Sequence, residues 1–319
     1  MATQSSWIGK TLNDRYEILE MLGQGGMSAV YKANDPNLRR VVAVKLIHEH
    51  LSSNPEFIRR FEEEAATVAQ LRHPNLIQVF DFAHDNETYF IVFEFVPGET
   101  LQQRLKRVAK QNHPMDVAVA IEVAAKTADG LHYAHNKGLI HRDIKPANIM
   151  LNVHSEPILM DFGIAKIMGG TQHTATGAVL GTARYMSPEQ IKGERIDPRT
   201  DIYSLGVTLY EMLGGRPPFA ADSAMTLMMM HITDSVPDLC AAREDVAPAL
   251  VAVVNRALEK DPANRYATAA EFAAALRGAM APDVSAAAAA AAAAMAGATL
   301  VESSPVVAAV DPEATVLDT

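Results

Sequence analysis

The 319-residue sequence contains one cysteine, Cys240, and aromatic residues make up only 6% of it. A single cysteine excludes an internal disulfide and a metal site built from cysteines alone, and it fits a reducing compartment. No strongly apolar run reaches the roughly 18 residues of a membrane span, and the longest apolar run is the weakly hydrophobic alanine stretch 286–294. The N-terminus has no basic region followed by an apolar segment, so we expect no signal peptide and a cytoplasmic protein.

Positive charge is also scarce, since the formal net charge is -10. General nucleic-acid binding needs clustered Lys and Arg, so we expect no nucleic-acid partner, and any anion site must be local. The remaining composition, 49% hydrophobic and 21% charged, is typical of a soluble globular protein with a sizeable core. The length favours about two domains or lobes.

The hydrophobic pattern changes its period along the chain. Short β-rich runs with one helical interval near 55–72 predict an antiparallel β lobe over residues 16–95, preceded by an extension at 1–15. Helical periodicity follows over residues 96–277, after the connector VPGET at 96–100. Residues 278–319 are rich in alanine and poor in aromatics, and we interpret them as a disordered tail. The expected fold class is therefore α+β with two lobes.

A glycine-rich stretch, LGQGGMSAV at residues 22–30, lies between two predicted strands. Without a Cβ, glycines such as Gly23 and Gly25 let backbone N–H groups approach an anion closely. Taken alone, the stretch fits a hairpin turn better than an anion site. It is not a dinucleotide fingerprint, which needs a strand, a turn and a helix in one βαβ unit.

Lys45 stands in the middle of the apolar strand VVAVKLI. A lone strand lysine is usually solvated, but burying its ammonium is costly unless it meets an acid. On the next helix the apolar face runs through Phe57, Phe61, Ala65, Val68 and Leu71. Glu64 falls beside this face, and we expect it to pair with Lys45.

The segment HRDIKPANIM at residues 141–150 groups charges with an amide on a predicted loop. Asp143 can accept a proton from an incoming hydroxyl, and Lys145 can neutralise charge on a group being transferred. Asn148, with Asp161 of the MDFG stretch, offers the oxygen ligands that Mg²⁺ prefers. Each fragment alone also fits a loop of solvated charges. Together they indicate a site for a phosphate and its metal.

The order of these motifs, from the glycine loop through VAVK, the helix Glu, HRDIKPAN and DFG to SPE, resembles the Hanks-type protein kinases. GTARYMSPEQ and DPANRYATAAEF are most similar to the bacterial eukaryotic-like Ser/Thr kinases, and the resemblance covers residues 16–277. It implies a bilobal protein kinase fold, with a small antiparallel β lobe carrying one helix and a larger helical lobe. It also implies transfer of the ATP γ-phosphoryl group to protein Ser or Thr hydroxyls, with Mg²⁺, or alternatively Mn²⁺, held by Asn148 and Asp161.

The resemblance further implies roles for single residues. Lys45, paired with Glu64, holds the α- and β-phosphates, Asp143 orients the substrate hydroxyl, and Lys145 favours a Ser or Thr acceptor. Phe93 stands at the back of the nucleotide pocket. The residues expected to bind the nucleotide are Leu22, Gly23, Gly25, Val30, Ala43, Lys45, Glu94, Val96, Met150 and Met160.

An activation segment is implied between Asp161 and Glu189, and it is rich in hydroxyl groups. A phosphate on Thr174 or Thr176 would add a charge of about -1.5 to -2, pair with Arg142 and order the segment. We therefore predict autophosphorylation there, although threonines in a loop equally fit a merely solvated segment.

Other residues are given structural roles by the resemblance. Thr182 would contact the catalytic Asp, Glu189 would pair with Arg265, and Asp201 would brace the catalytic loop. Two departures occur, because Ser28 stands where many members have a third glycine and SPE replaces APE. Neither removes a charged catalytic group, so we still expect activity.

Partners are open to several interpretations. Met225, Met228 and Met229 fit a core stripe or, alternatively, a substrate-docking or homodimer surface. In the tail, Thr315 precedes Asp318 by three residues, a spacing similar to phosphothreonine ligands of forkhead-associated domains. Rival functions are a nucleotide-binding pseudokinase scaffold and a small-molecule kinase. The substrates, the activating signal and any continuation into a membrane or sensor region stay open.

Overall fold

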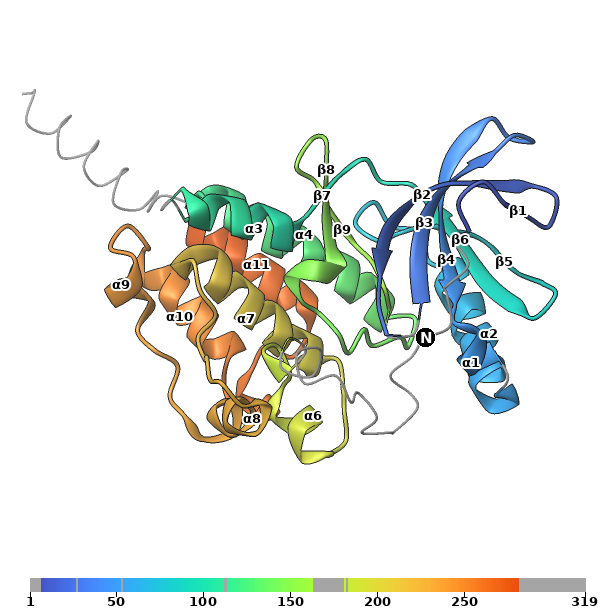
Figure 1. The fold of residues 1–319 in the computed structure, drawn as a ribbon. Coiled ribbons are helices and arrows are strands. Elements are labelled where there is room, and N and C mark those ends of the chain that lie inside the picture. Colours follow the sequence, from blue (N-terminus) through green and yellow to red (C-terminus); the bar gives the residue numbers. More distant parts are fainter. Residues whose placement is uncertain are drawn as a thin grey trace, which may run out of the picture. The chain divides into compact units, whose positions relative to one another are not determined.

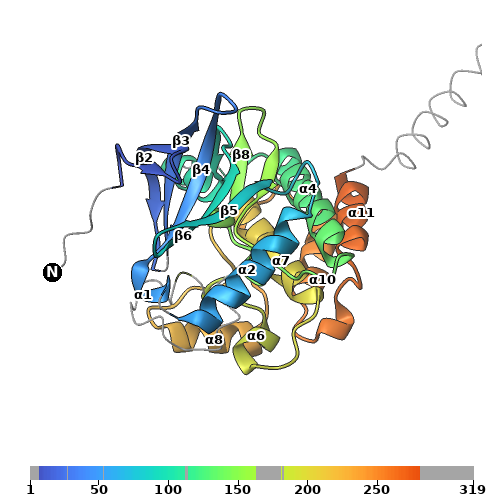
Figure 2. The same ribbon diagram turned by 90° about the vertical axis from the view of Figure 1, so that its right-hand side faces the viewer.

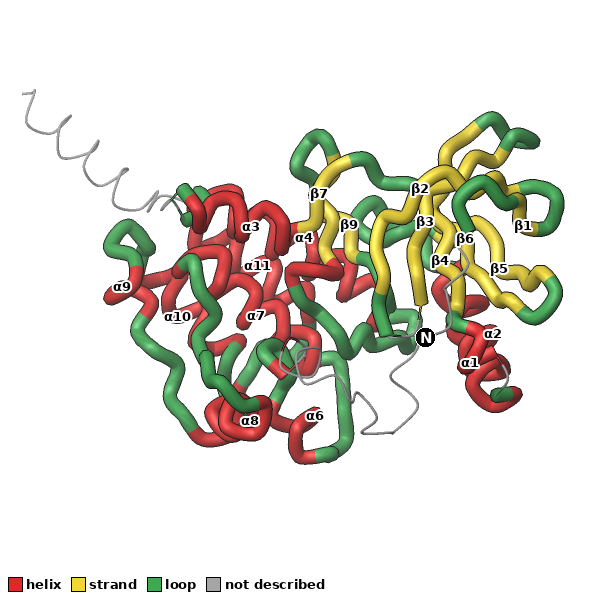
Figure 3. The backbone as a smooth tube through the Cα atoms, viewed as in Figure 1, coloured by secondary structure: helices red, strands yellow, loops and turns green. Residues whose placement is uncertain are grey.

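The computed structural model describes residues 7–26, 28–52, 54–111, 114–162, 181 and 183–280. In the first part of this region the backbone forms mostly strands, and in the second part mostly helices (Figures 1 and 3). The expected α+β class, an antiparallel β lobe followed by a helical lobe, is confirmed.

The β lobe is built on one six-stranded sheet in which every neighbouring pair is antiparallel, with strand order β1-β2-β3-β4-β6-β5. Its strands are β1 (Thr11–Leu12), β2 (Tyr16–Gln24), β3 (Ser28–Asp35), β4 (Arg40–Ile47), β5 (Val79–Asp85) and β6 (Thr88–Glu94). The alternation of apolar side chains sets the two faces of β4. Val42, Val44 and Leu46 are buried in a core on one face, while Ala43 and Lys45 alternate with them and are half-buried on the other.

Helix α2 (Pro55–Ala69) packs on the sheet through the apolar face that the sequence predicted (Figure 2). It begins where the Asn54 side chain accepts hydrogen bonds from the N–H groups of Glu56 and Phe57 at 3.0 and 3.1 Å. Phe61 is buried and meets Phe82 of β5 edge to face, with ring centroids 5.6 Å apart. The structure adds a short helix, α1 (Glu49–Ser52), to the single helix expected in this lobe.

The second part begins with a small sheet of order β7-β8-β9 and continues into helices. Its elements are β7 (Gly98–Thr100), α3 (Leu101–Lys110), α4 (Val117–His135), η1 (Pro146–Asn148), β8 (Ile149–Asn152), β9 (Pro157–Leu159), α6 (Pro188–Lys192), α7 (Arg199–Gly214), α8 (Ala224–Thr233), α9 (Leu239–Ala242), α10 (Pro248–Ala257), η2 (Pro262–Asn264) and α11 (Ala269–Met280). Helix α4 ends at His135, close to the predicted stop at Gly138, which has a φ of 79°. Helices α4 and α7 form the centre of the core, with most of their side chains buried.

The interpretation of the α8 methionines as core is wrong for two of them. Met225 is 70% exposed and Met229 is 46% exposed. The buried residues of α8 are Leu227 and His231, one turn apart, and positions two residues away point to the opposite side. Met228 packs against a small cluster that contains Leu227.

Within the described region, no helix has the length and apolarity needed to cross a membrane. The tail predicted from 278 onward is described only as far as Met280, the last residue of α11.

Gly98 marks a close backbone approach at the start of the small sheet. Its φ is 151°, and a Cβ there would overlap the carbonyl oxygen of Leu151. We expect Gly98→Ala to lower the free energy of unfolding by about 2 kcal/mol or more, because backbone strain adds to a clash with backbone. Gly138→Ala is the matched control, since φ there is 79° but an added Cβ would have no atom within 4 Å. At that position the backbone strain alone should cost about 1–2 kcal/mol. Denaturant unfolding measures both, and an equal loss in the two variants would contradict the clash.

Candidate active site

Strand register aligns three residues predicted to bind a nucleotide. Gly23 of β2 is paired with Val30 of β3, and Val30 is paired with Lys45 of β4. On the same strand, Ala43 pairs with Phe93 of β6. Because paired residues share one face of a sheet, the glycine stretch, an apolar side chain and an ammonium occupy one row across the β lobe.

Lys45 links this row to the second part of the chain. Its Nζ donates to Oδ1 of Asp161 at 2.7 Å, and the two side chains are 16% and 41% exposed. Partial burial of the Asp161 carboxyl opposes its ionisation, but the Lys45 ammonium outweighs this effect, and the pKa of Asp161 lies below its ordinary value. The carboxylate is therefore ionised at neutral pH.

Asp143, Lys145 and Asn148 form a connected group. Lys145 Nζ donates to Oδ2 of Asp143 at 2.9 Å. The amide nitrogen of Asn148 donates to the backbone oxygen of Asp143 at 2.8 Å and to its Oδ2 at 3.1 Å. A backbone hydrogen bond of 2.8 Å, from the N–H of Met160 to the carbonyl oxygen of Asn148, joins this group to the segment that carries Asp161. Residues of the segment 141–150 thus lie beside the segment of Asp161, to which the distant Lys45 is bonded.

His141 and Asp201 hold the backbone of this group. Oδ2 and Oδ1 of the buried Asp201 accept the N–H groups of His141 and Arg142, each at 2.8 Å. His141 Nδ1 accepts the N–H of Asp143 at 3.2 Å, so its Nε2 carries the hydrogen donated to the Met160 oxygen at 2.8 Å. Burial lowers the pKa of His141, which fits this neutral tautomer.

Further apolar side chains expected around the nucleotide are partly exposed. Ala43, Met150 and Met160 are half-buried and pack against the main core. Val96, which is expected to bind the nucleotide through its backbone, has its side chain buried in that core. Leu22 is 48% exposed near the end of β2. Partial exposure of residues on both sheets leaves apolar surface for a flat ring.

A buried ion pair anchors α6 beside this group. Arg265 donates to both oxygens of Glu189 at 2.7 and 2.8 Å, and Thr200 donates to the same carboxylate at 2.7 Å. This is the pair that the resemblance implied.

The family model described as "Protein kinase domain" matches residues 16–275. The chain belongs to the protein kinase family. The serine/threonine-protein kinase PknB of Mycolicibacterium smegmatis is 44% identical to this kinase over 271 residues, which cover 83% of this chain and 43% of that one. A probable serine/threonine-protein kinase of Clostridium perfringens is 42% identical over 265 residues, with 83% and 38% covered.

Solved structures agree with the kinase assignment. The crystal structure of the Mycobacterium tuberculosis PknI kinase domain superposes with a TM-score of 0.67 at 29% identity, covering 85% of this chain and 98% of that chain. This confirms the expected bilobal kinase fold. The chain spans about two fifths of the length of the curated relatives named above, 38% and 43%.

Some residues predicted for the kinase site lie outside what the structure describes. These are the side chain of Glu64 and the whole of Thr174, Thr176 and Thr182. The Lys45–Glu64 pair therefore stays a prediction, while Lys45 is seen bonded to Asp161.

Two contacts of the kinase site were missed by reasoning from the sequence. His135 Nε2 lies 2.7 Å from Oδ2 of Asp201, and Gln190 Nε2 donates to the Arg142 carbonyl at 2.9 Å. The partners are 66 and 48 residues apart, and neither pair has a local signal in the sequence.

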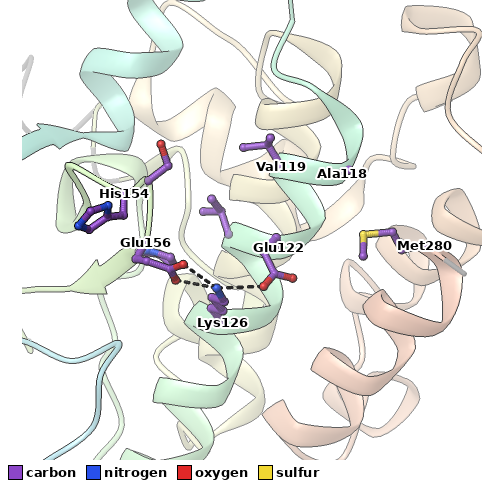
Figure 4. A pocket seen from close by; sticks show the side chains of 10 residues that line it. Ala118, Val119, Glu122, Lys126, His154, Glu156 and Met280 are labelled. Atoms are coloured by element: carbon purple, nitrogen blue, oxygen red, sulfur yellow. Dashed lines mark hydrogen bonds and ion pairs between the residues drawn. The ribbon is translucent and has the colours of Figure 1, made fainter.

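The described residues also enclose a cavity of about 360 Å³ (Figure 4). It is formed by α4, the loop before β9 and Met280 of α11. Lys126 at its wall is held by Glu156 at 2.6 and 2.8 Å and by Glu122 at 3.0 Å (Figure 4). The hydrogen bond to Glu156 is the main reason that the pKa of Lys126 is raised. None of the predicted site residues lines this cavity.

Proposed function

We propose that this kinase domain transfers the γ-phosphoryl group of ATP to Ser and Thr hydroxyls of proteins. The observation that carries the proposal is the convergence of Asp143, Lys145 and Asn148 through bonds of 2.8–3.1 Å, with the Lys45–Asp161 pair tied to them by backbone. All three groups whose loss is typical of a pseudokinase, Lys45, Asp143 and Asp161, are present.

In the proposed reaction the Asp143 carboxylate accepts the proton of the Ser or Thr hydroxyl group while the hydroxyl oxygen forms a bond to the γ-phosphorus. The bond from that phosphorus to the bridging oxygen breaks, and ADP leaves. Lys145, 2.9 Å from the same carboxylate, is placed to neutralise charge on the phosphoryl group in transfer. Lys45 would bind the α- and β-phosphates, facing the glycine stretch across Val30.

The donor set near Asp143 fits a hard cation. Both bonds of Asn148 to Asp143 use the amide nitrogen, so its oxygen is directed elsewhere, and Asp161 provides an ionised carboxylate. Among the described residues no group of three or more His, Cys, Asp or Glu side chains could hold a metal, and Mg²⁺ suits such a sparse set because it keeps several waters and binds the substrate phosphates. When bound, the metal neutralises charge on the β- and γ-phosphate oxygens. Mn²⁺ would use the same oxygen donors.

We also propose that the domain is activated by autophosphorylation at Thr174 or Thr176. Arg142 supports this, because its Nε is buried and has no hydrogen-bond partner among the described residues. A buried donor without an acceptor costs about 1–3 kcal/mol. A phosphate would supply the acceptor and a charge of about -1.5 to -2.

The test is incubation of the purified chain with radiolabelled ATP and Mg²⁺, with and without a generic protein acceptor, followed by site mapping. We expect label in the acceptor and at Thr174 or Thr176, and a lag in turnover followed by a faster phase that the double variant Thr174→Ala, Thr176→Ala lacks. No transfer to either protein would leave only a nucleotide-binding scaffold. Transfer to the acceptor with both threonines unmodified would refute the activation step alone.

Tail threonines provide a proposed route to a partner. Phosphorylated Thr315, with Asp318 three residues on, would suit a forkhead-associated domain. The same mapping experiment decides this, because an unmodified tail on an active enzyme would contradict it.

A further inference from the structure

The side chain of Gln190 joins two parts of the candidate site that are 48 residues apart. Its Nε2 donates to the carbonyl oxygen of Arg142 at 2.9 Å, and its Oε1 accepts the N–H of Ser187 at 3.0 Å. Ser187 Oγ in turn accepts the N–H of Gln190 at 3.3 Å, which completes a capping box at the start of α6. One side-chain amide thus caps a helix and reaches the catalytic loop.

The carbonyl that Gln190 binds belongs to the peptide unit joining Arg142 to Asp143. The N–H of that same unit donates to His141 Nδ1 at 3.2 Å. The orientation of this peptide unit sets the direction in which the Asp143 side chain leaves the backbone. Both polar groups of the unit, its N–H and its carbonyl, are bonded to side chains. The carbonyl group is held by Gln190 alone among the described residues.

This peptide unit needs support because Arg142 has a φ of 65°. The left-handed conformation costs a residue with a Cβ about 1–2 kcal/mol. Asp201 holds the N–H of Arg142 at 2.8 Å on one side of the residue, and Gln190 holds its carbonyl on the other. Strain of this kind persists only where the surroundings over-determine it.

The backbone around Gln190 is held by hydrogen bonds to other elements. The neighbouring Glu189 is bound by Arg265 at 2.7 and 2.8 Å, and the Ser204 hydroxyl donates to the Tyr185 carbonyl at 2.7 Å. A donor on a rigid element orients its acceptor more firmly than one on a loop.

We propose that Gln190 is a positioning residue for the catalytic base, holding the Arg142 carbonyl and thereby the orientation of Asp143. The inference rests on the proposed phosphoryl transfer. The position requires a group that donates to one partner and accepts from the other, and a neutral amide does both. An ionised carboxylate would keep the capping bond to Ser187, lose the donor, and place negative charge against a carbonyl oxygen.

The experiment compares Gln190→Glu with Gln103→Glu in the full chain. Gln103 makes the same capping box at the start of α3, where its Oε1 accepts the N–H of Thr100 at 2.8 Å, and among the described residues its side chain forms no hydrogen bond to the catalytic loop. At pH 8 we expect Gln190→Glu to lower kcat about 3–10-fold, the equivalent of one hydrogen bond, with KM for ATP within about twofold. Gln103→Glu should match the parent in kcat.

The pH dependence separates positioning from mere stability. Once protonated, the carboxyl group that Gln190→Glu introduces again offers one donor and one acceptor, so the ratio of variant to parent kcat should rise as pH falls from 8 to about 5.5. A glutamate side chain ordinarily titrates near 4.3; the Arg142 carbonyl oxygen raises that value and the bond from the Ser187 N–H lowers it, so we expect the rise at the acid end of this range. A flat ratio together with a lowered Tm would overturn the proposal and leave a purely structural role.

Two further outcomes are decisive. A Gln190→Glu variant as active as the parent at pH 8 would overturn the positioning role while leaving the proposed function intact. A parent chain that transfers no phosphate to any acceptor would refute the proposed function, and this inference with it.

Discussion

Replacing Asp143 by Asn is expected to lower the rate of phosphoryl transfer by about 10²-fold or more, the usual effect of losing a positioned base. Asparagine has the same shape, and its oxygen can still accept hydrogen bonds from Lys145 and Asn148, which now bind the carboxylate at 2.9 and 3.1 Å. Nucleotide affinity should stay nearly unchanged, because the change leaves Lys45 and Asp161, the groups expected to hold the phosphates and the metal, in place. Radiolabel transfer and nucleotide titration measure the two quantities.

The control for this variant is Asp222→Asn, which makes the same change at an exposed position. It should transfer phosphate at the parent rate. If Asp143→Asn retained full activity, Asp143 would not be the base, and the proposed mechanism would be wrong. If nucleotide affinity fell together with activity, the residue would serve binding rather than the chemical step.

Replacing Arg265 by Ala should have the largest effect on stability, a loss of about 3–5 kcal/mol in the free energy of unfolding. The side chains of Arg265 and Glu189 are 0% and 4% exposed, so the change leaves an uncompensated carboxylate in the core. It also removes donors to the carbonyl groups of Glu259 and Lys260, at 2.8 and 3.1 Å. Denaturant unfolding at neutral pH measures the loss.

Arg59→Ala provides the comparison on the surface. The Arg59–Glu63 pair spans 2.6 Å on α2, but its side chains are 61% and 62% exposed, and such helical pairs contribute about 0.3–0.5 kcal/mol. Similar losses in the two variants would contradict the importance assigned to burial.

Lowering the pH should narrow the difference in the free energy of unfolding between the parent and Arg265→Ala. Burial opposes ionisation of Glu189, but its hydrogen bonds to Arg265 outweigh this and hold its pKa below the ordinary value of 4.5. In the parent, the contribution of the pair is complete above pH 4.5 and is lost as pH falls through the lower, folded-state pKa. In the variant, the two bonds from Arg265 are gone, and burial of Glu189 is opposed mainly by the bond from the Thr200 hydroxyl. Protonation of Glu189 as pH falls then relieves more of the cost of its burial than in the parent. A difference that stays constant on acidification would argue against an ionised pair.

The local sequence pattern predicted strands and helix faces correctly where burial follows the periodicity of apolar residues along the chain. The β-rich run SAVYKAND became β3 at Ser28–Asp35, and the apolar face of α2 was placed correctly from its 3.6-residue period. The same kind of pattern failed for α8: Met225, Met228 and Met229 do share one side of the helix, but the residues buried in the core, Leu227 and His231, lie on another side. Apolar character alone did not show which side of that helix meets the core.

Contacts between segments far apart in the chain produce no comparable pattern in the sequence. Lys45 binds Asp161 across 116 residues, and no local pattern in the sequence indicates this bond. The pair of Lys45 with Glu64 stays a prediction, because the Glu64 side chain lies outside the described residues. Gln190 gave no sign of its bond to Arg142, because a helix-capping glutamine satisfies a local rule completely.

The sequence by itself determined the family, the two-lobed fold class and the types of group available for chemistry, because motif residues and periodicities are properties of short stretches. Only the tertiary structure decided which charges meet, that a glutamine of α6 holds the peptide unit before Asp143, and which side of α8 is buried. Such hydrogen bonds and ion pairs act over about 3 Å, and chain folding alone brings atoms from residues far apart in sequence within that distance.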